Sequence, residues 1–438
     1  MEIISRHLVR GVRSGFVGDN LFLLNIKKVG ALFFCFYLFI SMNSPVLRLL
    51  AIPIAGYYIS IILIGLLSLI LYLNKKFVFT RQRYFLFFSL LFLVFHFSFP
   101  TWSGYWMVKT LLAFVPLFFV IFWDNEIYYL TFGYFRKMMI FFAVCSIVVT
   151  GLLLFLPYNA LPYIELEPLS AVHQNANMIY RIYGIVVSYD MIVFNIGSLS
   201  FLRTAGPLSE PGHLGVFLGL TLCIEMLLYK KRTPILIICG CMTFSTAFYV
   251  ILVIQELYNI FVNRKFDWKV YLFLISGLIL LFILIDNSII TSVWDYAIGR
   301  NLNEENILDN RTNSTALFLW NKFLHSSSFL RLFVGHGTFF LETTKDLVLA
   351  DYREFLYDSG LYGFLLLVIV FLGIFIKVKM RYVFLFGSVI VLIFLHRSWM
   401  FWYPYVYVLP LIAFGAYTYK SNLESFHKDM ISRDSLER

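Results

Sequence analysis

The sequence predicts an all-α polytopic integral membrane protein with about 12 transmembrane helices. Hydrophobic residues make up 60% of its 438 residues and charged residues only 14%, and its mean hydropathy is +0.81. Apolar runs of about twenty residues recur along the chain, whereas a soluble domain carries about a quarter charged residues. We therefore expect one membrane domain over residues 1–438.

Ten apolar runs are long enough to cross a bilayer as one helix each, because about twenty residues span the hydrocarbon core. They lie near 29–47, 50–73, 84–100, 105–123, 138–156, 212–229, 270–286, 356–376, 382–398 and 402–419. The segment 234–262 is followed and preceded by basic residues, which favours the cytoplasm for both of its ends. It is therefore predicted to form a tight hairpin that turns near "TFSTAF" (243–248), where hydroxyl side chains can satisfy loosened backbone groups.

The distribution of basic residues predicts the orientation, since lysine and arginine in short loops favour the cytoplasmic side. Predicted cytoplasmic segments hold 24 of the 35 lysines and arginines, including a cytosolic or interfacial N-terminus (1–28) and a cytosolic tail (420–438). Both termini are then cytoplasmic, and two long outer loops cover 157–211 and 287–355. The net charge of +10 is explained by the basic residues that keep short loops on the cytoplasmic side. No nucleic-acid partner is therefore expected.

Seven arginines nevertheless lie in or beside the predicted outer loops. A guanidinium group is a planar donor that binds phosphates through two hydrogen bonds. As a group, these residues favour a phosphate-bearing substrate at the outer membrane surface. Taken singly, each can instead pair with loop glutamates or lipid headgroups. The seven are Arg181, Arg203, Arg300, Arg311, Arg331, Arg353 and Arg397.

The stretch "RTAGPLSEPGHLG" (203–215) stands directly before an apolar run. Pro211 and Gly212 are expected to set the angle at which the next helix begins. Glu210 lies at the N-terminus of that helix, so its side chain can either cap the helix or act as a base at the membrane boundary. His213, one turn further, is interpreted as a structural or interfacial histidine.

The second outer loop ends "FVGHGTFFLETTKDLVLADYREFLYDSGLYGF" (333–364). Glycines on both sides of His336 allow a sharp turn that exposes the imidazole, which is then either a proton acceptor or merely solvated. Gly360 and Gly363 permit a bend or a close helix contact. The charged residues at the start of the following span are expected to be solvated: Asp351, Arg353, Glu354 and Asp358.

No cofactor or metal is expected. All five cysteines lie inside apolar runs, so neither a disulfide framework nor a zinc site is indicated. Asp124 and Glu126 form an acidic pair on the predicted cytoplasmic side. Glu165 and Glu167 form an outer pair that could hold a divalent ion, although a solvated loop is the favoured interpretation. There is no glycine-rich nucleotide loop. Two glutamates inside spans, Glu225 and Glu256, are expected to pair with the nearby Lys230 and Arg264.

Four local signals resemble the O-antigen and polysaccharide polymerases (Wzy-type), in the bacterial group that also contains the O-antigen ligases. The first is "RTAGPLSEPGHLG", where Arg203, Gly206, Glu210 and Pro211 match. The others are "TFSTAFYVILVIQEL" (243–257), "DNRTNSTALFLWNKF" (309–323) with Arg311 and Trp320, and "LFVGHGTF" with "DSGLYGF". The resemblance covers nearly the whole chain in topology, and the order and spacing of the signals carry it.

The resemblance implies glycosyl transfer on the periplasmic face of the bacterial inner membrane. A glycan on undecaprenyl pyrophosphate would be the donor, a lipid-linked repeat unit the acceptor, and a chain-length regulator protein a possible partner. Arg203, Arg311 and Arg353 would bind the pyrophosphate, and Glu210 or His336 would accept the proton. Many relatives carry a His-Asn pair ahead of the last glycine motif. "ADYREFLYDSG" has none, so Arg353 or His336 is expected to replace it.

Two other classes stay open. An O-antigen ligase would share the donor chemistry but use a lipid A–core acceptor. A lipid-linked oligosaccharide flippase is the second, although transporters usually show two similar halves with binding sites at the membrane midplane. Here the arginines and the longest loops gather on one predicted face.

Overall fold

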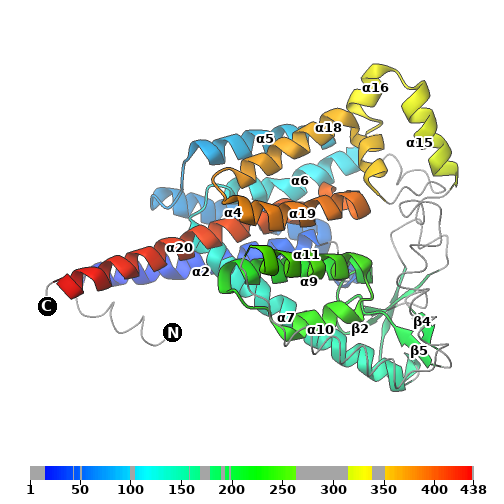
Figure 1. Ribbon diagram of the computed structural model, residues 1–438, viewed down its shortest axis with the longest axis horizontal. Coiled ribbons are helices and arrows are strands. Elements are labelled where there is room, and N and C mark those ends of the chain that lie inside the picture. The colour runs from blue at the N-terminus through cyan, green and yellow to red at the C-terminus, as the bar shows by residue number, and fades with distance from the viewer. Residues whose placement is uncertain are drawn as a thin grey trace.

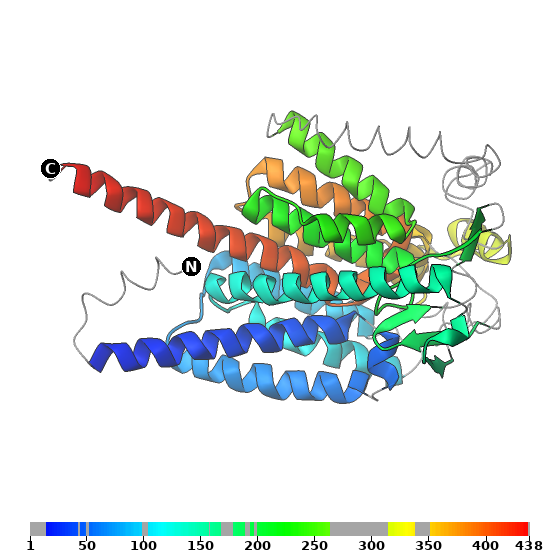
Figure 2. The ribbon, with the colours of Figure 1, turned by 90° about the horizontal axis from the view of Figure 1, so that it is seen from below.

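A computed structural model describes residues 15–42, 44–49, 52–98, 104–156, 158–167, 178–188, 193–196, 199–262, 314–337 and 351–436. Most helices run along the long axis and pack side by side (Figure 1). The start of α2 and the end of α20 lie at one end of this bundle, and the strands lie at the other (Figures 1 and 2). We call these the terminal end and the strand end.

Helices dominate the part of the chain that the structure describes. The α-helices are α2 (Gly15–Ser41), α3 (Pro45–Leu49), α4 (Ile52–Leu73), α5 (Arg81–Ser98), α6 (Gly104–Val120), α7 (Asn125–Phe155), α9 (Pro211–Tyr229), α10 (Pro234–Met242), α11 (Thr246–Phe261), α15 (Ser314–Ser326), α16 (Phe329–Val334), α18 (Tyr352–Phe375), α19 (Met380–Arg397) and α20 (Tyr405–Leu436). Two 3-10 helices are η1 (Tyr158–Ala160) and η4 (Ser398–Trp402).

Six of these helices are long and apolar enough to cross a membrane, which confirms the predicted helical membrane character. They contain the segments Leu23–Ser41, Ala55–Leu73, Asn125–Phe155, Pro211–Tyr229, Tyr352–Phe375 and Met380–Trp402. The described helices overlap nine of the ten predicted runs, and the run at 270–286 lies outside the described residues. The total of about 12 crossings stays a prediction.

The predicted hairpin exists as α10 and α11, which are separated by a break at 243–245. The Thr243 hydroxyl donates to the Gly240 carbonyl at 2.6 Å and accepts from the Ser245 N–H at 3.2 Å. Phe244 takes a left-handed conformation with φ 47°. The hydroxyl-rich turn therefore satisfies loosened backbone groups as expected. With only nine residues, however, α10 is too short to cross a bilayer alone.

Short strands occupy much of the predicted loop at 157–211, where the sequence indicated none. Strands β1 (Ile164–Leu166), β2 (Tyr180–Tyr183) and β3 (Val186–Ser188) form an antiparallel sheet, and β4 (Val193–Ile196) pairs with β5 (Leu199–Leu202). Glu165 lies opposite Arg181 across β1 and β2. The Val187 N–H donates to the Gly206 carbonyl at 2.7 Å, which fixes the sheet to the segment that leads into α9.

Helix α9 is the most enclosed of the six candidate spans among the described residues, with 94% of it buried. Two glycines let α11 approach it closely. A Cβ on Gly215 would lie 3.0 Å from the Ser245 side chain, and a Cβ on Gly219 would lie 2.9 Å from Ile251. The hydroxyl-rich turn is thereby held beside the first two turns of α9.

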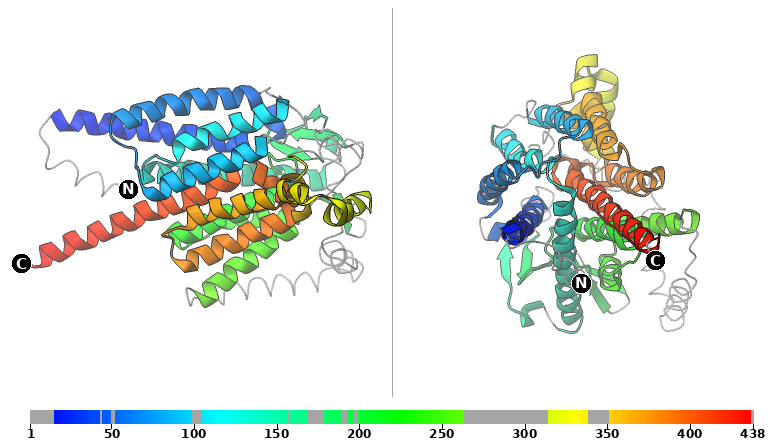
Figure 3. Two further views of the ribbon diagram at one scale, coloured as in Figure 1. Left: turned by 90° about the horizontal axis from the view of Figure 1, so that it is seen from above. Right: turned by 90° about the vertical axis from the view of Figure 1, so that its left-hand side faces the viewer.

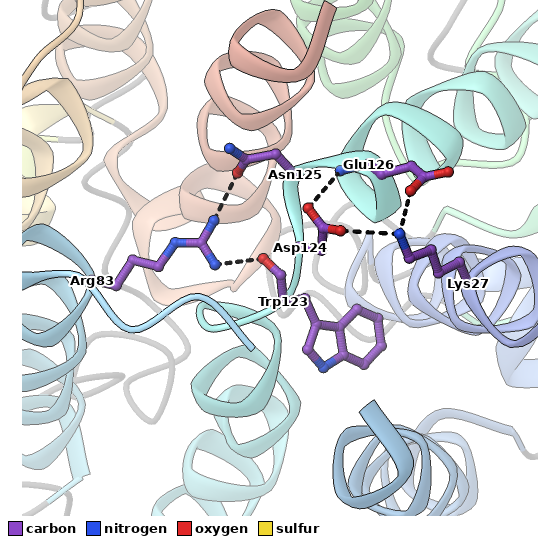
Figure 4. A network of polar contacts seen from close by, with 6 residues as sticks. All are labelled: Lys27, Arg83, Trp123, Asp124, Asn125 and Glu126. Atoms are coloured by element: carbon purple, nitrogen blue, oxygen red, sulfur yellow. Dashed lines mark hydrogen bonds and ion pairs between the residues drawn. The ribbon is translucent and has the colours of Figure 1, made fainter. Parts of the chain in front are cut away.

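Charged residues at the terminal end pair with one another (Figure 4). Lys27 on α2 binds Asp124 at 3.0 Å and also Glu126 at the start of α7, while Arg83 donates to Asn125 at 2.7 Å. These bonds join α2, α5 and α7. The two carboxylates of the Asp-x-Glu pair thus share a lysine.

The expected partner of Glu225 is wrong, whereas Arg264, the expected partner of Glu256, lies outside the described residues. Glu225 pairs with Arg136 of α7 and accepts from the Thr233 N–H at 2.7 Å. Glu256 pairs with Arg232. Lys230 was expected to pair with Glu225 because it is close along the chain, but helix packing brings Arg136 to this carboxylate. Each of these pairs joins two residues from the predicted cytoplasmic side.

Candidate functional site

The site begins at the first turn of α9, where Pro211 starts the helix and Glu210 precedes it in an extended conformation. Glu210 occupies the N-cap position, but its side chain makes no capping hydrogen bond. Oε2 of Glu210 instead accepts a hydrogen bond from Nη1 of Arg397 at 2.6 Å. The side chain of this glutamate therefore orients toward another helix, and the capping interpretation is wrong.

Arg397 is the last residue of α19, and its side chain is only 7% exposed, against 31% for Glu210. Its guanidinium lies directly against Gly212. A Cβ at Gly212 would come within 2.1 Å of Nη2 of Arg397, so any larger residue there would displace the guanidinium. The "Glu-Pro-Gly" sequence thus supplies a carboxylate, a helix start and the space for the arginine.

A second ion pair lies at the start of α18. Asp351 caps this helix by accepting from the Arg353 N–H at 2.9 Å, and it also accepts from Nε of Arg353 at 3.0 Å. The Ser398 hydroxyl donates to the Asp351 carbonyl at 2.6 Å. Because Ser398 follows Arg397 directly, this bond connects the two ion pairs.

The expected solvation of the charges at this helix start is wrong. Asp351, Arg353, Glu354 and Asp358 are all buried, and Asp358 is completely enclosed. Burial of charge requires compensating partners, and the pairing of Arg353 with Asp351 supplies one. The guanidinium of Arg353 is therefore already engaged by a carboxylate.

Arg203 binds the turn between α10 and α11. Its Nε donates to the Thr243 carbonyl at 3.0 Å, and its Nη2 donates to the Phe244 carbonyl at 3.1 Å. These carbonyls follow the C-terminus of α10, where a positive charge is favoured. The same turn packs on Gly215 of α9 through Ser245. Arg203 is therefore linked to the first turns of α9 through the α10–α11 turn.

His336 lies where the backbone of α16 crosses that of α18. Its N–H donates to the Tyr357 carbonyl at 3.0 Å, and its ring stacks on the Tyr357 ring at 4.4 Å. Burial, together with the nearby positive charge of Arg331, lowers the pKa of His336 to about 4. The imidazole is therefore neutral at physiological pH, which is the form that can accept a proton.

Two glycines make this crossing possible. Gly335 (φ 86°) and Gly360 (φ 62°) both have conformations that favour glycine. A Cβ on Gly360 would lie 2.4 Å from the Phe333 carbonyl oxygen. Gly360 bends α18, and a Cβ on Gly363 would lie 2.9 Å from Nε2 of His96, so both predicted roles of this glycine pair are present.

The strand-end cluster is defined here as Arg203, Glu210, Asp351, Arg353 and Arg397. Ser398 connects the Glu210–Arg397 pair with the Asp351–Arg353 pair, and Arg203 is included because it binds the turn that packs on α9. His336 lies about one helical turn along α18 from Arg353 through its contact with Tyr357. Arg311 lies outside the described residues. His213 has the structural role expected of it, since it is buried and its Nε2 lies 3.1 Å from the Tyr405 hydroxyl.

Sequence reasoning placed Arg397 among the outer arginines but did not assign it to the site. A signal was present, because an arginine at the end of an apolar run needs an acidic partner on the same side of the membrane. Glu210 is such a residue, although it is distant in sequence.

The cluster can combine two kinds of chemistry. A carboxylate held in one orientation beside a guanidinium can accept a proton from a hydroxyl group. Buried guanidinium groups near it can stabilise negative charge that develops on a leaving phosphate. No group of three or more potential metal ligands occurs among the described residues.

Comparison of the chain with models of protein families, with curated proteins and with solved structures yields no match. The geometry of the strand-end cluster is therefore the basis for assigning a function.

Proposed function

We propose that this protein is a glycosyltransferase that polymerises oligosaccharide repeat units on undecaprenyl pyrophosphate. It would act on the periplasmic face of a bacterial inner membrane, with both termini in the cytoplasm. The growing glycan would be transferred to an incoming lipid-linked repeat unit, as in O-antigen or another surface polysaccharide. A chain-length regulator protein is a further partner in this proposal.

One observation carries the proposal: three arginines and a glutamate gather at one end of an apolar helical bundle. Arg397 binds Glu210 at the mouth of α9, and Ser398 links this pair to Asp351, the partner of Arg353. Arg203 binds the turn that packs on α9. The Glu210 side chain is partly exposed, and the bundle itself contains long apolar helices. This combination suits a substrate with a phosphate-bearing head and a lipid tail.

The reaction breaks the bond between the anomeric carbon of the donor glycan and a pyrophosphate oxygen. A hydroxyl oxygen of the acceptor sugar forms the new bond to that carbon. Its proton passes to Glu210 or, alternatively, to neutral His336, and undecaprenyl pyrophosphate leaves with the bonding electrons. No metal or other cofactor takes part in this scheme.

Arginines would hold the pyrophosphate and stabilise its charge as it leaves. Arg311 and Arg203 keep this role in the proposal, and Arg353 would act from its pair with Asp351. Arg397 would orient Glu210 toward the acceptor, because its guanidinium holds the carboxylate through Oε2.

The test is the surface polysaccharide profile of a deletion strain carrying either the wild-type gene or a variant. Loss of a polymerase leaves lipid A–core with a single repeat unit. Loss of a ligase leaves bare core with polymer still on the carrier lipid, and loss of a flippase leaves repeat units in the cytosolic leaflet. A full polymer ladder in the deletion strain would refute the proposal.

A further inference from the structure

The short helix α16 presents apolar side chains to its surroundings. Phe329 is 80% exposed and Leu330 is 70% exposed. The helix is nevertheless firmly placed, because the Gly335–Gly360 crossing fixes its C-terminus to α18. Ser328 caps its N-terminus by accepting from the Arg331 N–H at 3.4 Å. An ordered helix with large exposed apolar side chains indicates a contact surface.

The position of α16 restricts what that surface can contact. In the right-hand view of Figure 3, which looks along the bundle, the yellow segment with α15 and α16 projects beyond the outline of the other helices near α5 and α18. Figure 1 places the same segment at the strand end. It therefore lies beside the bundle at the level where α18 begins, rather than above the centre of the bundle.

The apolar surface of α16 continues onto the outer face of α18. The Phe329 ring stacks on Phe333 at 6.0 Å, and Phe333 packs against Tyr362 at 5.4 Å. Leu361 and Leu365 extend this surface along α18, where both are exposed. Since α18 is one of the six helices able to cross a membrane, its exposed apolar face is the face that would meet lipid.

We propose that α16 is an interfacial helix that inserts Phe329 and Leu330 into the leaflet at the strand end. The partner is the lipid surface itself, because the apolar face of α16 is continuous with the lipid-facing side of α18. Exposed Arg331 would reach the headgroup phosphates while its stem stays along the apolar boundary. The inference depends on α18 crossing the membrane and is independent of the proposed enzymatic activity.

The experiment uses the full-length protein in lipid nanodiscs and an environment-sensitive fluorophore on an introduced cysteine. The test variant is Phe329→Cys, and the control is Asn321→Cys, at an exposed polar residue of α15. The five native cysteines are buried or half-buried, and the protein without an introduced cysteine supplies the background. Quenching is measured with a shallow nitroxide lipid and with aqueous iodide.

We expect the label at 329 to be quenched several-fold more by the nitroxide lipid than the label at 321, with the opposite order for iodide. Leu330→Cys should reproduce the result at 329, so the outcome does not rest on one variant. Strong iodide quenching at 329 and 330 would place α16 in water. Protection from both quenchers would mean that protein covers this surface. Either result would overturn the proposal.

Discussion

Nη1 of Arg397 donates a hydrogen bond to Oε2 of Glu210 at 2.6 Å across 187 residues of sequence. The bond ties the end of α19 to the start of α9, which is the most enclosed of the six described candidate spans. Only the glutamate of this pair keeps substantial exposure. The arrangement therefore directs a carboxylate outward from a guanidinium that is fixed inside the fold.

Replacement of Glu210 by glutamine should abolish proton transfer while keeping a hydrogen-bond acceptor for Arg397. If Glu210 is the base, polymer formation should fall by about 10²–10⁴-fold, with little change in the amount of inserted protein. The measurement is polymer formation from lipid-linked repeat units by purified protein. Activity close to wild type in Glu210→Gln would exclude this residue as the base and leave His336 as the candidate.

The variant Arg397→Ala should lower both activity and stability. Breaking a buried ion pair costs about 3–5 kcal/mol, and the partial exposure of Glu210 should reduce this to roughly 2–3 kcal/mol. A double-mutant cycle with Glu210→Gln measures the interaction energy between Arg397 and Glu210 apart from their other contacts. Restored stability in the double variant without restored activity would fit a positioning role for Arg397. Additive losses in the cycle would contradict the coupling.

The substitution Gly212→Ala should mimic the loss of Arg397, because the new Cβ would lie 2.1 Å from Nη2 of that residue. We expect lower activity and a lower unfolding temperature. Gly133→Ala on α7 is the matched control, since nothing lies within 4 Å of a Cβ there. Alanine in an open helical position should be neutral or stabilise by up to about 1 kcal/mol. Equal behaviour of the two variants would argue against the described packing.

Arg203→Ala should abolish chain elongation while the protein stays inserted in the membrane, and the same is expected for Arg311→Ala. The structure adds a second consequence for Arg203, because its guanidinium holds the carbonyls of Thr243 and Phe244. Its removal should cost about 1–3 kcal/mol in stability. Thermal unfolding and chain elongation measured in Arg203→Lys separate the structural role of Arg203 in the turn from its proposed role in substrate binding. Retained stability with lost elongation would point to substrate binding by the guanidinium.

The positions of the long helices could be predicted from sequence because they depend on local hydrophobicity. The predicted run at 212–229 differs from α9 by one residue at its start, and the break near Thr243 appears where small hydroxyl residues occur. The glycines at 360 and 363 likewise indicated a bend and a close helix contact, because both features depend on the local backbone.

The ion-pair partners of the buried and half-buried glutamates could not be predicted from sequence in the same way. Glu225 pairs with Arg136 rather than with a sequence neighbour, and Glu210 pairs with Arg397. Such contacts depend on which helices lie side by side, and hydrophobic periodicity in one chain does not determine that. The strands in the first long loop were also missed, because runs of three or four residues carry little periodic signal.

The stability of the protein should depend on the ionisation of His336. Its pKa in the folded protein is lowered from 6.5 to about 4 by burial and by Arg331. The unfolded chain therefore binds the proton first as the pH falls. The stabilising contribution is complete above pH 6.5 and should be lost as the pH falls from about 6.5 to about 4.

Unfolding temperatures measured between pH 4 and pH 8 would check this dependence. The variant His336→Phe keeps a ring for stacking on Tyr357 and should lose part of the acid sensitivity in that window. Arg331→Gln should raise the pKa of His336 in the folded protein. The pH range over which stability is lost should then end at a higher pH than in the wild type, whereas Arg331→Lys should leave this range unchanged. Identical pH profiles for wild type and His336→Phe would refute the assignment.

The crossing of Gly335 and Gly360 leads to the last prediction. Both residues combine a positive φ with a ψ close to 180°, a region that is essentially restricted to glycine. A Cβ on Gly335 would also lie 2.3 Å from the Asp358 carbonyl oxygen. Alanine at either position should therefore cost more than the roughly 1–3 kcal/mol of backbone strain alone.

Separation of α16 from α18 should follow, and it would expose the segment around His336 to protease. Limited proteolysis of Gly335→Ala and Gly360→Ala in nanodiscs measures this directly. Gly387→Ala on α19 is the control, because no atom lies within 4 Å of a Cβ there. Wild-type protection in both crossing variants would contradict the close approach of the two backbones. Protection lost in Gly387→Ala as well would show that the effect is not specific to the crossing.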